Sequence, residues 1–228
     1  MQKDFETIKN ALSQIFKKKD HFQYFTEKNM TGWEKWLQIE LALQLNQIGE
    51  SKIEDPFFYH MGKLRPMSKN KFEKCFIDLT FRVKNSQRKT IGAIELKVTK
   101  SQNGLKAAFS DLYKISAIKT TNWKFRSVTA ILIHPTKDKE TKFKRLKEEL
   151  LNHNLKISDG LNTQTMSIPN SNFELIMIGW EESLNKNMTT ESYRLWIKKV
   201  REIFNKHDAK PKLNSVQNIN KHHAKKTY

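Results

Sequence analysis

The chain has 228 residues, of which 42 are Lys or Arg and 24 are Asp or Glu, so its net charge is +18. The length suits one globular domain, the single cysteine excludes an internal disulfide framework or a multi-cysteine zinc site, and no apolar run is long enough to cross a bilayer. The charge favours a polyanionic partner, so we expect nucleic acid rather than a membrane. Because the first residues lack an apolar signal segment, we also expect a cytoplasmic protein.

The first part of the chain is predicted to hold two helices and a short strand. Apolar residues recur at helical spacing over residues 4–19, and a second helix is expected over residues 31–47, with Gly49 as its stop. Residues 53–61 favour a short strand, which Pro56 confines to a sheet edge or a strand start.

Two strong strands follow, over residues 74–83 and 90–98, and the polar segment between them indicates a hairpin. Regular alternation along the first strand predicts Ile77 and Leu79 on one face and Asp78 on the other. An Asp is unfavourable in a strand, so its place within this apolar run suggests a functional role.

The hairpin is expected to gather three ionisable residues. Glu95 and Lys97 share a face of the second strand, and pairing of the two strands puts Asp78 roughly opposite Glu95, with facing Cβ atoms about 5 Å apart. Two carboxylates this close repel one another unless a cation lies between them, and Mg²⁺ prefers oxygen ligands and retains water. With Lys97 beside it, such an ion suits hydrolysis of a phosphodiester. Taken alone, Glu-Leu-Lys is more typical of a solvated row of charges on a strand, and Asp78 on the neighbouring strand is what favours a site.

The helix over residues 31–47 supplies a further carboxylate. Glu40 falls within the predicted apolar stripe, whereas Glu34 and Gln38 are expected to point elsewhere. The stripe consists of Trp33, Trp36, Leu37, Leu41 and Leu43. A carboxylate on an apolar face has to be paired, protonated or metal-bound, so Glu40 is a candidate metal ligand. The alternative is a salt bridge to a Lys or Arg at the edge of the core.

The rest of the chain is predicted to alternate helices and strands. Helices are expected over residues 103–120, 138–152 and 189–204, and strands over residues 125–133 and 173–180. This order implies an α/β fold with a mixed sheet flanked by helices. We expect one domain over residues 1–206, with its core at about 31–135, followed by a disordered basic tail over residues 207–228.

The helix over residues 103–120 is expected to bury one face and expose the other. The buried stripe consists of Leu105, Ala108, Phe109, Leu112, Ile115 and Ser116, and the exposed positions include Asp111. Nucleic-acid contacts are expected from Lys100, Lys106, Lys114, Lys124 and Arg126. The alternative for these side chains is an ordinary solvated surface.

Glu40 on a helix, Asp78 on a strand and Glu95-Leu96-Lys97 on the next strand together resemble the PD-(D/E)XK nuclease superfamily. The predicted order of elements over residues 31–135 also resembles the restriction-endonuclease-like αβββαβ core. The resemblance implies that Asp78 and Glu95 bind Mg²⁺, for which Mn²⁺ can substitute, that Lys97 is catalytic, and that Glu40 supports the metal. Ile77 stands where the family name has Pro.

The resulting expectation is a Mg²⁺-dependent endonuclease that acts on DNA rather than RNA, in restriction, defence or mobile-element biology. A homodimer is a further expectation, since cutting both strands commonly requires two subunits. Three alternatives stay open: a catalytically inactive nucleic-acid-binding protein on the same fold, an RNA-directed nuclease, and a protein whose lysines bind an acidic partner. The sequence has no zinc-binding motif and no Gly-rich phosphate loop.

Overall fold

The computed structural model of the protein describes residues 4–17, 32–60, 72–84, 90–98, 104–117, 124–135, 148, 152, 162–181, 195–200 and 202. These residues form a mixed sheet in the order β1-β2-β3-β4-β6-β5, flanked by helices. The helices are α1 (Asp4–Lys17), α3 (Trp33–Asn46) and α4 (Gly104–Ala117). The strands are β1 (Gly49–His60), β2 (Phe72–Val83), β3 (Thr90–Val98), β4 (Lys124–Pro135), β5 (Asn162–Ser167) and β6 (Phe173–Glu181). The expected α/β class, with a mixed sheet between helices, is confirmed.

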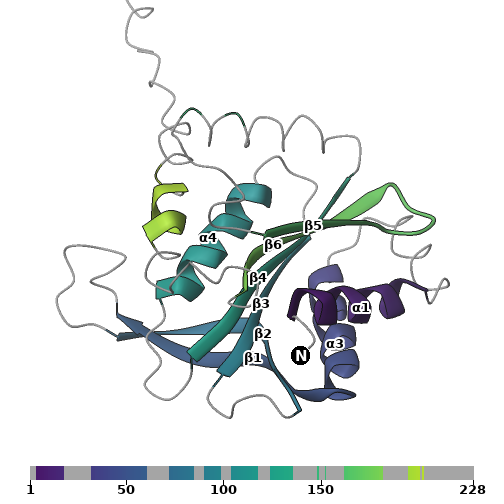
Figure 1. Ribbon diagram of the computed structural model, residues 1–228, viewed down its shortest axis with the longest axis horizontal. Coiled ribbons are helices and arrows are strands. Elements are labelled where there is room, and N and C mark those ends of the chain that lie inside the picture. Colours follow the sequence, from purple (N-terminus) through teal and green to yellow (C-terminus); the bar gives the residue numbers. More distant parts are fainter. Residues whose placement is uncertain are drawn as a thin grey trace, which may run out of the picture.

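The sheet separates two hydrophobic cores. Helices α1 and α3 cover one face, and α4 covers the other together with the helical residues 195–200 (Figure 1). Strands β3 and β4 are parallel and are joined through α4, whereas the other neighbouring strands are antiparallel. Strand β3 lies between β2 and β4, and its side chains Ala93, Ile94 and Leu96 are fully buried in the two cores.

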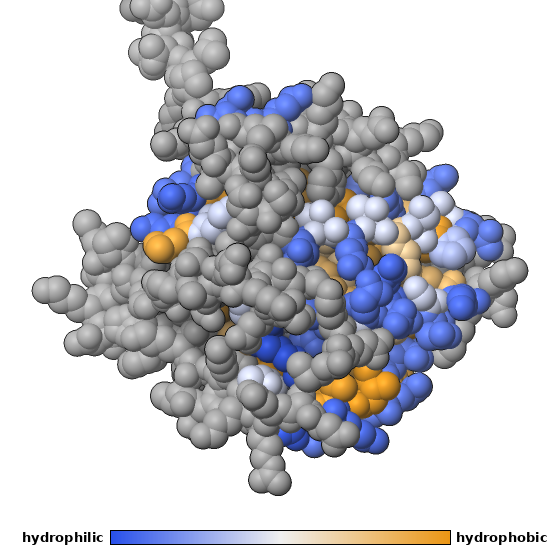
Figure 2. Space-filling model, in the orientation of Figure 1, coloured by the Kyte–Doolittle hydropathy of each residue, from blue (hydrophilic) through white to orange (hydrophobic). Residues whose placement is uncertain are grey.

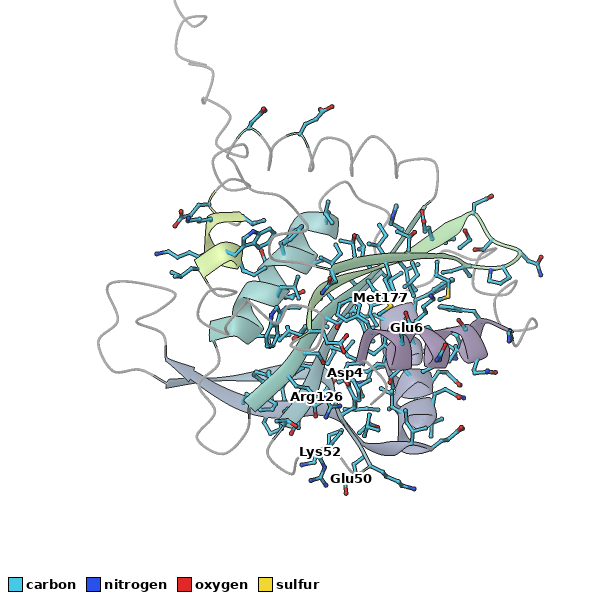
Figure 3. The ribbon with its side chains drawn as sticks, in the orientation of Figure 1. Asp4, Glu6, Glu50, Lys52, Arg126 and Met177 are labelled. Atoms are coloured by element: carbon cyan, nitrogen blue, oxygen red, sulfur yellow. The ribbon has the colours of Figure 1, made fainter. Side chains whose placement is uncertain are left out.

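Helix α1 is held at its first turn by buried polar contacts to two strands. The carboxylate of Glu181 in β6 accepts the backbone N–H of Asp4 at 2.7 Å and that of Phe5 at 3.1 Å, so it satisfies two donors at the start of the helix. The Asp4 carboxylate in turn accepts Arg126 Nε at 2.7 Å and the Ser127 hydroxyl, both from β4 (Figure 3). These contacts fix the start of α1 against the middle of the sheet.

The connection from α3 to β1 differs from the prediction. Helix α3 ends at Asn46, and Gly49 is the first residue of β1 rather than the stop of the helix. A Cβ at Gly49 would lie 2.0 Å from the carbonyl oxygen of Arg82, so glycine is required there by the close approach of β2. Strand β1 is therefore longer than predicted, but it lies at the edge of the sheet, as Pro56 demands.

The regular alternation expected in β2 is wrong at Asp78. Ile77 packs in the core beneath α4, whereas Leu79 packs in the core beneath α1 and α3. The break lies opposite Glu54, which has a φ of 51°, and the paired positions pass from Leu79 directly to Ile77. The interrupted pairing frees polar groups of Asp78 for other contacts, which are described below.

The C-terminal half is described in part. The strands predicted over 125–133 and 173–180 are confirmed as β4 and β6, and the buried stripe of α4 is confirmed at Leu105, Ala108, Phe109, Leu112 and Ile115. Strand β5 was not predicted, because its residues (NTQTMS) alternate between exposed and half-buried and include one apolar side chain. Of the helices predicted over 138–152 and 189–204, the described residues 148, 152, 195–200 and 202 are helical. The tail over 207–228 lies outside the described residues.

The surface in Figure 2 is mostly hydrophilic where it is described, with small apolar patches between charged residues. Two exposed apolar side chains, Ile39 and Leu43, lie on α3. In the described part of the chain, none of the helices combines the length and the apolarity that a membrane crossing needs.

Candidate active site

The end of β3 carries Glu95 and Lys97 on the same side of the sheet. Ala93 belongs to the core beneath α4, and Ile94 and Leu96 belong to the opposite core, so alternation directs Glu95 and Lys97 toward α4. Glu95 is buried, with 1% of its surface exposed, whereas Lys97 is half-buried one residue before the strand ends. The strand thus holds the Glu95 carboxylate inside the molecule and places the Lys97 ammonium near the strand end, where it is partly exposed.

Asp78 lies beside these residues on the neighbouring strand. The antiparallel pairing of β2 with β3 ends at the pair of Leu79 with Ile94, and the next residues along the two strands are Asp78 and Glu95. There the regular ladder gives way to a side-chain contact, because Asp78 Oδ2 accepts the backbone N–H of Leu96 at 2.8 Å. One oxygen of the Asp78 carboxylate is therefore fixed against the backbone of β3.

Gln38 of α3 binds the backbone of Asp78 at the break in β2. Its side-chain amide donates to the backbone carbonyl of Asp78, and only 4% of the residue is exposed. The backbone and the side chain of Asp78 are thus held by α3 and β3, respectively. With its backbone and one carboxylate oxygen both held, Asp78 keeps one orientation without needing a bound ligand.

The helical carboxylate at this site is Glu34 rather than Glu40. The expectation that Glu34 and Gln38 point away from the sheet is wrong: Glu34 Oε2 accepts the backbone N–H of Val98 at 3.4 Å, and Glu34 Oε1 lies 3.7 Å from Lys97 Nζ. Glu40 lies roughly 120° around the helix axis from Glu34, so its side chain projects from a different side of α3. Of these two carboxylates of α3, Glu34 is the one that contacts Lys97.

Lys97 lies between carboxylates from both faces of the sheet. Its Nζ is 3.7 Å from Glu34 Oε1, on α3, and 3.3 Å from Asp111 Oδ2, on α4. The expectation that Asp111 is an exposed residue is wrong, because only 18% of its side chain is exposed. Asp111 follows Ala108 by three residues and precedes Ile115 by four. It therefore lies on the same inward side of α4 as these buried residues.

These charges shift the pKa values of two members of the cluster. Burial lowers the pKa of Lys97, but the carboxylates of Asp111, Glu34 and Asp78 outweigh burial and raise it above its ordinary value. The pKa of Glu34 is also raised, by burial first and by the negative charges of Asp78 and Asp111, against the opposing effect of Lys97. Lys97 therefore stays an ammonium at neutral pH.

The donor atoms at this site are carboxylate oxygens, the ligand type preferred by Mg²⁺, which is the cofactor that the resemblance of the sequence implies. Among the residues that the structure describes around the end of β3, the carboxylates of Glu34, Asp78, Glu95 and Asp111 accompany the ammonium of Lys97. Carboxylates gathered in this way favour a cation between them, although the chain carries a net charge of +18. Among the described residues, no group of three or more His, Cys, Asp or Glu could hold a metal ion. The set suits Mg²⁺, which often binds one or two carboxylates and completes its shell with water or phosphate, better than a metal that needs a full cage of protein ligands.

Of the residues predicted to contact nucleic acid, the structure describes the side chain of Arg126. Lys106 and Lys114 lie in α4 and Lys124 begins β4, but their side chains, and all of Lys100, are outside the described residues. Arg126 has a different role from the one expected. Its guanidinium pairs with the buried Asp4 and lies 5.5 Å from the ring centroid of Phe81, with 15% of its side chain exposed. This position is poorly suited to contact a phosphate backbone.

Sequence reasoning missed Glu34, Gln38 and Asp111 at the site. Each was placed off the predicted apolar stripe of its helix, because a charged or amide side chain was expected to face away from the core. A usable signal was present in α3, where Glu34, Gln38, Leu41 and Leu45 recur at the spacing of three to four residues that marks one side of a helix. Polar residues inside such a stripe indicate an inward-facing site rather than a solvated surface.

When the sequence and the structure are compared with known proteins, no family model matches, and neither a curated protein nor a solved structure matches.

Proposed function

We propose that the protein is a Mg²⁺-dependent nuclease of the restriction-endonuclease-like kind, with Asp78, Glu95 and Lys97 at its active centre. One observation carries the proposal: Asp78 and Glu95 occupy neighbouring positions on adjacent strands, and the ammonium of Lys97 is held at the same strand end. The order α3, β1, β2, β3, α4, β4 supports it, because this order corresponds to the αβββαβ core that the sequence resembles. Glu34 takes the supporting role first assigned to Glu40.

The residues have separate tasks in this proposal. Asp78 and Glu95 would hold the divalent cation, and Glu34 lies close enough to Lys97 to add negative charge at the same strand end. When bound, the cation supplies a water of lowered pKa and offsets negative charge on the phosphate. Because its pKa is raised, Lys97 keeps its proton and serves as a positive charge beside the phosphate rather than as a general base.

The charge of the whole chain supports a nucleic-acid substrate. A net charge of +18 draws phosphate backbones to the surface, while the local acidic cluster draws the cation to one place. We propose DNA as the substrate, in restriction, defence or mobile-element biology, and a homodimer as the form that cuts both strands. These finer assignments rest on the resemblance of the sequence.

The proposal is tested by incubating the protein with plasmid DNA and with RNA, with and without Mg²⁺ or Mn²⁺. Asp78→Asn is the informative variant, because asparagine keeps an oxygen that can accept the Leu96 N–H but removes the charge. Glu50→Gln is a matched control, since it neutralises a carboxylate whose side chain is 71% exposed and pairs with Arg82.

Metal-dependent cleavage of DNA by the wild type and by Glu50→Gln, with a loss of at least about 100-fold in Asp78→Asn, would support the proposal. Cleavage of RNA but not of DNA would change the proposed substrate to RNA and leave the proposed metal-dependent hydrolysis unchanged. DNA binding without cleavage under any of these conditions would identify the inactive binding protein instead and would overturn the proposed enzyme.

A further inference from the structure

Among the described residues, Asp111 is the closest counter-ion of Lys97, and it lies on the opposite face of the sheet from Glu34. The distance from Lys97 Nζ is 3.3 Å to Asp111 Oδ2 and 3.7 Å to Glu34 Oε1. Asp111 is also the less exposed of the two, with 18% of its side chain accessible against 43% for Glu34. A shorter and less solvated ion pair is the stronger one, so Asp111 holds the ammonium more firmly than Glu34 does.

The hold of Asp111 matters because an ammonium and a divalent cation compete for the same oxygen ligands. Lys97 stands two residues after Glu95 on the same side of β3, and the Asp78 carboxylate is near enough to influence the pKa of Lys97. Lysine carries its charge on a flexible stem with several rotatable bonds. If the hold from α4 were lost, the ammonium could turn toward Asp78 or Glu34 and neutralise the negative charge that attracts a cation.

We infer that Asp111 is a positioning residue, which keeps the Lys97 ammonium on the α4 side of the strand end and so prevents it from competing with a divalent cation for the carboxylates of Asp78 and Glu95. The inference rests on the proposed function of this site. It assigns a task to a helix residue outside the Asp and Glu-x-Lys motif. It also explains why the inward side of α4 carries a carboxylate among Ala108, Leu112 and Ile115.

The inference predicts that Asp111 acts through Lys97, which a double-mutant cycle measures directly. The four proteins are the wild type, Asp111→Asn, Lys97→Met and the double variant, and the readout is Mn²⁺ affinity measured by titration calorimetry. Asp111→Asn should weaken Mn²⁺ binding about 10-fold when Lys97 is present, equivalent to about 1.4 kcal/mol. In the Lys97→Met background the same change should alter the affinity less than about 3-fold, because no ammonium is left to redirect.

Asp111→Glu is the conservative variant, and it should restore most of the affinity because it keeps a carboxylate in reach of Lys97. Thermal unfolding of each variant checks that the fold is retained, and Asp111→Glu carries the test if Asp111→Asn unfolds. In that case, wild-type affinity in Asp111→Glu supports the inference, and a 10-fold loss overturns it.

Equal effects of Asp111→Asn in both backgrounds would overturn the inference, since they would show that Asp111 attracts the cation directly. A normal Mn²⁺ affinity in Asp111→Asn would overturn it as well. In both cases a loss of Mn²⁺ binding in Asp78→Asn would leave the proposed function standing. Failure of the wild type to bind Mn²⁺ would instead overturn the proposed function itself, and the inference with it.

Discussion

The contacts of Asp78 depend on an irregularity of the backbone of β2. The break in β2 sends Ile77 and Leu79 to opposite cores, and the polar groups of Asp78 are then bound by Gln38 and by the Leu96 N–H. The sequence predicted Asp78 as a site residue because an Asp within an apolar strand is unfavourable. It could not predict the contacts that fix the carboxylate, since these depend on an irregularity that regular alternation does not foresee.

The choice between Glu34 and Glu40 is the sharpest test at the scale of single residues. If Glu34 supports the cation, Glu34→Gln should lower Mn²⁺ affinity about 10-fold by removing a charge near the site. Glu40→Gln, a matched change on another side of α3, should stay within about 2-fold of the wild type. Titration calorimetry measures both, and a larger loss in Glu40→Gln would restore the role first expected for that residue.

Glu34 also predicts a pH dependence of the metal-free protein. Its pKa is raised in the folded state, by burial first, so the folded protein binds this proton more tightly than the unfolded chain does. Stability is therefore lost as the pH rises from the unfolded-state pKa, about 4.3, through the raised value. Glu34→Gln cannot lose this proton, so its free energy of unfolding relative to the wild type should increase between pH 4 and pH 7. Denaturant unfolding at both pH values measures the difference, and a decrease would contradict the assignment.

Among the elements, the strands were predicted better than the helix faces. The β2–β3 hairpin, β4 and β6 have strong alternating or continuous apolar patterns, and the structure confirms them. The apolar stripe of α3 was displaced because Leu43 was assigned to it, although 55% of Leu43 is exposed, whereas Trp36 does pack against the core. Which side of a mixed helix faces the sheet depends on its partners, and Gln38 is buried by its bond to Asp78.

The anchoring of helix α1 by Asp4 gives a prediction about the stability of a single element. Arg126→Met should destabilise the protein by about 3 kcal/mol, because the buried Asp4 carboxylate would lose the charge that balances it. Lys35→Met is the control, since it removes the ion pair to Glu54, in which both side chains are more than half exposed, and it should cost less than about 1 kcal/mol. Denaturant unfolding measures both changes. Equal losses would show that the Asp4 network does not hold α1.

At the scale of the whole molecule, the charge distribution has two parts with opposite signs. The chain as a whole is strongly positive, whereas the end of β3 gathers carboxylates of Glu34, Asp78, Glu95 and Asp111. Composition predicted the first part. The acidic cluster depends on two helices and two strands that meet at one place, α3, α4, β2 and β3, so it became visible only in the fold.

The positive charge predicts how nucleic-acid binding responds to salt. Binding of double-stranded DNA should weaken steeply as salt is raised, with a slope of log affinity against log salt on the order of −4 or steeper, because phosphate contacts release counterions. Fluorescence anisotropy with a labelled duplex, in a buffer without divalent ions, measures the slope. A shallow slope would favour the alternative in which the lysines serve an acidic protein partner. Arg126→Met should leave the slope unchanged, since Arg126 is engaged with Asp4.

The most direct test of the account is to locate a divalent ion in crystals of the protein grown with Mn²⁺, by anomalous diffraction. We predict one strong peak about 2.1 Å from carboxylate oxygens of both Asp78 and Glu95, with the ammonium of Lys97 beside it and not between them. A Mn²⁺ ion bound elsewhere, or side chains of Asp78 and Glu95 that turn away from a common ligand, would contradict the nuclease site.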